Sequence, residues 1–60
     1  MKWSELRRKA ISQGWYLERH GSKHDIFVHP DKNYKIQIGR HDSEEVKKGL
    51  EKKLRKQIGF

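Results

Sequence analysis

The sequence predicts a two-layer α+β domain in the order α-β-β-β-α, with a three-stranded antiparallel sheet and both helices on one face of it. Three observations predict this fold. Apolar residues recur at helical spacing near both ends of the chain, and three segments of alternating character lie between them. The links between these segments are short enough for hairpins. Because one pattern runs through the chain without a linker, residues 1–60 are expected to form a single domain.

The first helix is expected over Ser4–Gln13. Ser4 is a residue type that caps helix N-termini, and the apolar residues Leu6, Ala10 and Ile11 recur near helical spacing after it. Gly14 supplies the left-handed conformation in which many helices end. The helix is therefore expected to stop just before the first strand.

Three strands are expected over Trp15–Arg19, Asp25–His29 and Tyr34–Ile38. The turn segments His20–Lys23 and Pro30–Asn33 separate them, so the sheet is predicted to be a meander. Side chains alternate between the two faces of a strand. The residues assigned to the helix-covered face are Trp15, Leu17, Ile26, Val28, Ile36 and Ile38.

The other face of the sheet is assigned to Tyr16, Asp25, Phe27 and His29. Phe27 would be exposed there, where it would stack on a base or pack under a protein partner, and we favour the partner. His24 has the parity of Ile26, so its side chain is expected to point toward the helix layer at the start of the second strand.

The second helix is expected to begin at Asp42 or Ser43, because Asp42 and Glu45 have the spacing of a capping box. A stripe of apolar residues then steps by four and is expected to face the core: Val46, Leu50, Leu54 and Ile58. Gly49 lies inside this helix, where glycine costs about 1 kcal/mol relative to alanine. We expect it to permit close approach to the sheet beside a bulky residue such as Trp15.

Composition favours a polyanionic partner. The chain has 15 Lys and Arg against 8 Asp and Glu, a formal net charge of +7, which favours nucleic acid through phosphate neutralisation. The longest apolar run, Ile26–Val28, is far too short to span a membrane, and no secretory leader is apparent. The absence of cysteine excludes disulfides and thiolate chemistry, which suits a reducing cytoplasm.

His24 is the candidate catalytic residue. In an antiparallel meander the start of the second strand lies beside the end of the third, which brings His24 toward Arg40, His41 and the start of the second helix. A helix N-terminus and an arginine bind phosphate oxygens. An imidazole exchanges protons near neutral pH, with a ribose 2′-OH or with a leaving 5′-oxygen. RNA carries its own nucleophile, so this chemistry needs neither metal nor cofactor.

Other interpretations of these side chains remain open. A histidine beside a turn is often only a structural hydrogen-bonding group. His20, His24 and His29 are a second candidate set, as metal ligands, but strand parity places His24 and His29 on opposite faces. Ser22 is a weak candidate nucleophile because no buried acid is evident to orient a neighbouring base, so we expect it to shape the turn or bind phosphate.

The basic side chains have an alternative interpretation too. Those of the second helix can form a solvated face, partly neutralised by pairs such as Glu51 with Arg55. The basic residues near the proposed His24 corner are less neutralised by acidic neighbours. They are Arg7, Arg8, Lys9, Arg19 and Lys23.

Several short motifs follow one another in an order that resembles a known family. They are Gly14-Trp15, Gly21-Ser22-Lys23-His24, His29-Pro30, Ile36-Gln37-Ile38 before His41, Gly49, and Ile58-Gly59. Together they cover essentially the whole chain. The sequence resembles the HicA (YcfA-like) mRNA interferase toxins of type II toxin–antitoxin systems, whose fold is similar to the double-stranded-RNA-binding domain.

This resemblance implies metal-independent cleavage of messenger RNA with His24 as the catalytic residue, and inhibition by a HicB-type antitoxin that covers the active corner. The residues expected to contact RNA are Arg8, Arg19, Gly21, Ser22, Lys23, Arg40 and His41. Many members carry proline shortly before the second histidine, whereas this chain has Gly39-Arg40-His41. His41 therefore departs from the family pattern in its neighbouring residues, whereas the motif that contains His24 matches it.

Two non-catalytic functions compete with the nuclease. A non-catalytic RNA-binding module of the same fold would bind in a salt-sensitive way and leave the RNA intact. A DNA-associated regulator is disfavoured because no helix-turn-helix spacing is visible.

Overall fold

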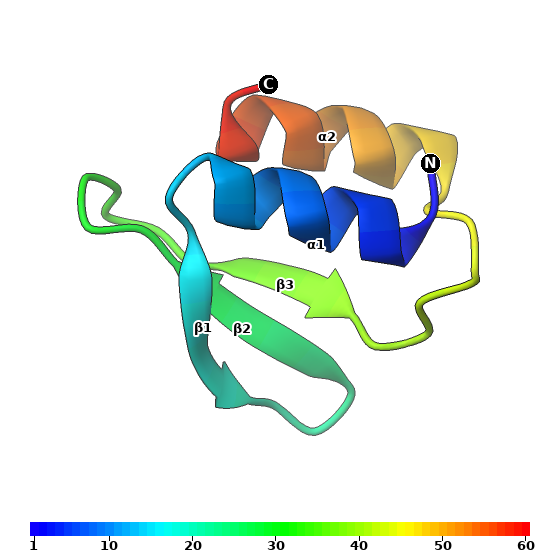
Figure 1. Ribbon diagram of the computed structural model, residues 1–60, viewed down its shortest axis with the longest axis horizontal. Coiled ribbons are helices and arrows are strands. Elements are labelled where there is room, and N and C mark those ends of the chain that lie inside the picture. Colours follow the sequence, from blue (N-terminus) through cyan, green and yellow to red (C-terminus); the bar gives the residue numbers. More distant parts are fainter.

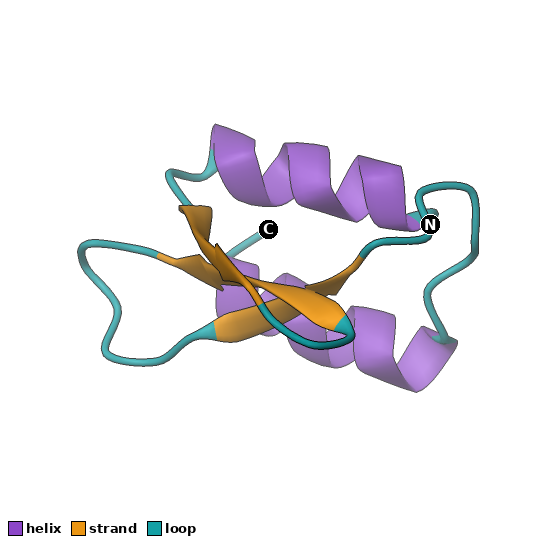
Figure 2. Ribbon diagram, turned by 90° about the horizontal axis from the view of Figure 1, so that it is seen from below, coloured by secondary structure: helices purple, strands orange, loops and turns teal.

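The computed structural model describes residues 1–60 and has the predicted element order (Figure 1). The elements are α1 (Trp3–Ser12), β1 (Tyr16–His20), β2 (His24–Val28), β3 (Ile36–Gly39) and α2 (Lys48–Ile58). The strands form one antiparallel sheet in the order β1-β2-β3. Both helices lie on the same side of the sheet (Figures 1 and 2), which confirms the predicted fold class. No helix has both the length and the apolar character needed to cross a membrane.

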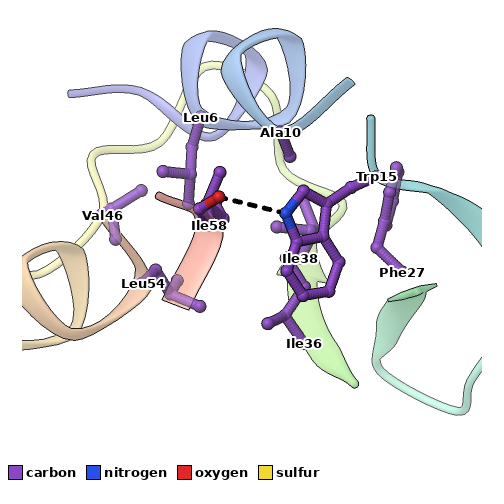
Figure 3. Packing of buried hydrophobic residues seen from close by; sticks show 9 residues of the cluster. All are labelled: Leu6, Ala10, Trp15, Phe27, Ile36, Ile38, Val46, Leu54 and Ile58. Carbon is purple, nitrogen blue, oxygen red and sulfur yellow. Dashed lines mark hydrogen bonds between the residues drawn. The ribbon is translucent and has the colours of Figure 1, made fainter. Parts of the chain in front are cut away.

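Trp15 is the central side chain of the core between the helices and the sheet (Figure 3). Its Nε1–H donates a hydrogen bond to the carbonyl oxygen of Ile58 at 3.2 Å, which ties the start of β1 to the end of α2. Rings of His29 and Tyr34 pack beside it, with centroids 5.4 and 5.7 Å away. The buried cluster comprises Leu6, Ala10, Trp15, Phe27, Ile36, Ile38, Val46, Leu54 and Ile58.

The face assignment of β2 was wrong. In the observed register Phe27 lies opposite Ile36 and Asp25 lies opposite Ile38, and directly opposed residues share a face. Phe27 is only 3% exposed and belongs to the core, so the expected exposed contact through Phe27 is also wrong. His24 and Ile26 instead lie on the outer face, away from the helices. Ile26, Phe27 and Val28 are all apolar, so this segment shows no alternation of polar and apolar residues that would indicate which of them face inward.

Helix α2 begins at Lys48, and not at Asp42 or Ser43 as predicted. The carbonyl oxygens of Asp42 and Glu44 accept hydrogen bonds from the backbone N–H groups of Ser4 and Trp3, at 3.2 and 3.1 Å. The first N–H groups of a helix have no partner within the helix. The segment before α2 therefore satisfies the N-terminus of α1 and cannot at the same time begin its own helix.

The predicted caps and the predicted apolar stripe change with these boundaries. Ser4 lies inside α1, and the carboxylate of Glu5 accepts the Lys2 N–H at 3.0 Å at the start of that helix. Glu45 contacts the amino group of Met1 at 2.8 Å and forms no capping box with a residue of α2. Leu50 is 41% exposed and is not part of the core, contrary to the prediction.

Two glycines give a matched test of the packing. A Cβ at Gly39 would lie 2.7 Å from the Trp3 indole, whereas a Cβ at Gly49 would meet nothing within 4 Å. The expected close approach at Gly49 was therefore wrong.

We expect Gly39→Ala to destabilise the fold by about 1–3 kcal/mol through overpacking, and Gly49→Ala to stabilise it by up to about 1 kcal/mol. Urea unfolding of both variants checks this, and equal midpoints would contradict it.

Candidate active site

The turn between β1 and β2 is closed by one backbone hydrogen bond, from the N–H of Gly21 to the carbonyl oxygen of His24 at 2.8 Å. A Cβ at Gly21 would lie 2.8 Å from that same oxygen. Glycine is therefore required here by the close approach of the two ends of the turn. Ser22 and Lys23 lie in the turn between Gly21 and His24, and His24 is the first residue of β2.

A hollow of about 190 Å³ opens on the outer face beneath this turn. The residues that line it are Arg19, Gly21, Ser22, Lys23, His24, Ile26 and Gln37. The structure thus brings together His24 and four of the residues expected to contact RNA. The lining contains two permanent cations and no carboxylate, so it favours a phosphate group.

The four histidines differ in what their rings contact. The Nδ1 of His29 accepts the N–H of Asp31 at 3.0 Å, and its Nε2 donates to the Gln13 carbonyl oxygen at 2.9 Å. His29 packs over Gly14, so the prediction that it lies on the outer face was wrong. Gly14 has a φ of 95°, which confirms the predicted left-handed residue. Both ring nitrogens of His29 are thus used in holding the fold.

His24 has a ring without a partner inside the protein. No hydrogen bond or ion pair joins its imidazole to another residue, although it is half-buried in the hollow. His20, by contrast, has its Nδ1 2.7 Å from the Oδ1 of Asp25. Among the histidines, His24 alone lies in the cationic hollow with both ring nitrogens available to a ligand.

The predicted corner around His24 is only partly formed. Arg40 does not line the hollow. Its Nε donates a hydrogen bond to Asp25 Oδ1 at 2.9 Å, and one terminal nitrogen contacts the carbonyl oxygens of Gly21 and His24. The exposed His41 follows it and does not line the hollow. Since α2 begins at Lys48, no helix N-terminus directly follows β3 there.

Arg8 also lies apart from His24. It lines a separate hollow on α1 together with Met1, Glu5, Lys9 and Ser12. A contact between Arg8 and RNA stays a prediction. The separate position of Arg8 does not support a contact with the same phosphate that His24 would meet.

The sequence analysis did not identify a buried acid. Asp25 is 8% exposed and contacts both Arg40 and His20 on the helix-covered face. These contacts, that of Arg40 first, hold the pKa of the Asp25 carboxyl below its ordinary value of 3.8. The only available signal was a lone acid in an apolar strand with an arginine at the end of the neighbouring strand. Ile26 and Gln37 were likewise not expected to line the hollow.

The lowered pKa of Asp25 predicts a pH-dependent stability. A carboxyl whose pKa is lower when folded stabilises the fold above its unfolded pKa, and this contribution is lost as the pH falls through the folded value. The free-energy difference between wild type and Asp25→Asn should therefore be constant above about pH 5 and shrink below the ordinary value of 3.8. Urea unfolding from pH 7 to pH 2 measures it. A difference that does not vary with pH would contradict the prediction.

A larger hollow, of about 560 Å³, lies beside β1 and is mainly apolar. Its exposed apolar side chains are Ile11, Tyr16 and Leu17. It does not contain His24, which lines the smaller, polar hollow. The chain has no cluster of three or more His, Cys, Asp or Glu side chains that could hold a metal ion.

The fold and the smaller hollow define a class of protein: a small basic α+β domain that presents an unpartnered histidine beside a cationic hairpin turn. Residues 3–60 match the family model of the HicA toxin of bacterial toxin–antitoxin systems. The chain therefore belongs to the HicA toxin family, which confirms the resemblance of its motifs. No curated protein and no solved structure matches the chain.

Proposed function

We propose that this toxin is a metal-independent endoribonuclease that cleaves messenger RNA, with His24 as its catalytic residue. The observation that carries the proposal is the His24 imidazole, which has no partner in the protein and lies in a hollow with Arg19 and Lys23. Membership of a toxin family makes a damaging activity on a cellular polymer the natural use of this site.

The proposed reaction needs only groups that the RNA, the hollow and the surrounding water supply. Arg19 and Lys23 hold the phosphate oxygens, with the Ser22 hydroxyl as a further donor. The 2′-oxygen of the ribose attacks the phosphorus and loses its proton, while the bond from phosphorus to the 5′-oxygen breaks and that oxygen gains a proton. His24 accepts the first proton, donates the second, or does both in turn, and where it moves only one of them a water molecule exchanges the other.

A HicB-type antitoxin is the proposed inhibitor. The family consists of toxins from toxin–antitoxin systems, so an antitoxin partner is implied. A protein that covers the hollow beneath the β1–β2 turn would exclude RNA from His24. A partner that binds the folded toxin and not the unfolded chain would also stabilise this small domain by mass action.

Incubating the purified protein with an RNA and with a DNA of the same sequence, each with and without EDTA, tests the reaction. We expect cleavage of RNA only, at an unchanged rate in EDTA, with new 5′-hydroxyl ends. Inhibition by EDTA would contradict the metal-independent mechanism. Salt-sensitive RNA binding without new ends would identify a non-catalytic RNA-binding module instead.

A further inference from the structure

Arg40 connects the end of β3 to both ends of the β1–β2 turn. It follows Gly39, the last residue of β3, and its terminal nitrogen Nη2 contacts the carbonyl oxygen of Gly21 and, at 3.3 Å, that of His24. These are the two residues that close the turn through their own backbone hydrogen bond. One guanidinium group therefore holds the point at which the chain enters the turn and the point at which it leaves.

Asp25 fixes the orientation of this guanidinium. The Asp25 side chain is 12% exposed, and its Oδ1 accepts a hydrogen bond from Arg40 Nε at 2.9 Å. A guanidinium is planar, so anchoring Nε on one side also sets the direction of the terminal nitrogens. Asp25 is itself the residue after His24, which places the anchor directly next to the proposed catalytic residue.

Besides Arg40, one side-chain contact lies at the base of the turn, between His20 Nδ1 and Asp25 Oδ1 at 2.7 Å, and it does not reach Gly21–Lys23. Gly21–Lys23 lies at the end of a hairpin whose strand β1 forms an edge of the sheet, and a single backbone hydrogen bond spans it. The His24 imidazole contributes nothing, because no residue bonds to it. The ring is therefore only as well placed as the backbone from which it projects.

We propose that Arg40, oriented by Asp25, is a positioning residue for RNA cleavage, which fixes the backbone of the turn and so holds the His24 imidazole in its hollow. This inference rests on the proposed function. It differs from the expectation that Arg40 binds phosphate, because Nε and Nη2 are already engaged by acceptors of the protein. A positioning residue affects the rate of cleavage of bound RNA, whereas a phosphate ligand affects affinity and its salt dependence.

The kinetic test compares Arg40→Ala and Arg40→Lys with the control Arg55→Ala. Arg55 contacts the carboxylate of Glu51 at 3.7 Å and the ring of Phe60, and it touches neither the turn nor β3. Single-turnover cleavage at saturating RNA should fall by about 10–100-fold in both Arg40 variants, because a small misplacement of a catalytic group is costly. Their RNA affinity should stay within about twofold, and Arg55→Ala should cleave at nearly the wild-type rate.

Free guanidinium provides a further kinetic readout. We expect it to restore part of the activity of Arg40→Ala and to have no effect on wild type, whereas ammonium should restore none because it lacks the planar fork. An unchanged single-turnover rate in Arg40→Ala would overturn the proposal. So would a loss confined to RNA affinity with a shallower salt dependence, which would make Arg40 a phosphate ligand.

Hydrogen exchange tests the positioning without any RNA. The Gly21 amide, which closes the turn, should exchange at least about fivefold faster in Arg40→Ala than in Arg55→Ala, while the amide of the buried residue Ile38 exchanges equally in both. If the wild-type protein fails to cleave RNA, the proposed function falls and this comparison still decides the role of Arg40. If Arg40→Ala fails to fold, Arg40→Lys is measured in its place. Equal Gly21 exchange in the Arg55 and Arg40 variants would overturn the proposal.

Discussion

Replacing His24 by alanine is expected to lower the rate of RNA cleavage by about 10²–10⁴-fold, the usual effect of removing a general acid or base. The ring makes no hydrogen bond that supports the fold, so the unfolding midpoint should change little. RNA affinity should also change little, because Arg19 and Lys23 supply the charge of the hollow. Single-turnover cleavage, RNA titration and thermal unfolding of the same samples measure these three quantities.

His24→Gln is the matched variant. Glutamine retains hydrogen-bonding capacity at the same position but cannot exchange a proton near neutral pH. We therefore expect it to be as slow as His24→Ala while still binding RNA. In cells, induction of wild type should arrest growth with loss of messenger RNA, and induction of either variant should not. Arrest by both wild type and His24→Ala would place the catalytic group elsewhere.

The sequence was sufficient to predict the order of the elements and the turn that carries His24. Gly14 and the two hairpin links are local signals, and local signals do not depend on how the sheet is registered. The cluster of Arg19, Ser22, Lys23 and His24 was predictable for the same reason. These residues are neighbours along the chain, so the hairpin brings them together whichever face is buried.

The direction of the His24 side chain was not predictable in the same way. It depended on which residues of β2 face inward, and this is set by the register with β3, in which Phe27 lies opposite Ile36. A shift of one residue exchanges the two faces of a strand. The structure therefore places His24 on the open face of the sheet, where the proposed RNA substrate would have access that the helix-covered face would not allow.

The start of α2 was missed because its segment serves a second element. Asp42 and Glu45 fit a capping box locally, but the backbone of this segment pairs with the residues around Lys2. A contact between residues more than 40 positions apart has no signature in local spacing. The same holds for Arg40, whose bonds to Asp25 and the turn arise only once β2 and β3 are paired.

Trp15→Ala is expected to bring the isolated domain close to unfolding. Large aromatic truncations in a core cost about 3–5 kcal/mol, from lost burial and from the cavity left behind. Trp15 is 2% exposed, and its loss also leaves the Ile58 carbonyl oxygen without the indole N–H. A domain of this length is expected to have a total stability of only about 3–9 kcal/mol.

The neighbouring residue provides the control for this measurement. Tyr16 is 56% exposed, so Tyr16→Ala removes an aromatic ring of similar size from the surface and should change the free energy of unfolding by no more than about 0.5 kcal/mol. Circular dichroism and urea unfolding of both variants give the comparison. Because Trp15 joins β1 to the end of α2, its removal should also lower the cooperativity of unfolding. A Trp15→Ala domain with the unfolding midpoint of Tyr16→Ala would show that the core does not depend on this contact.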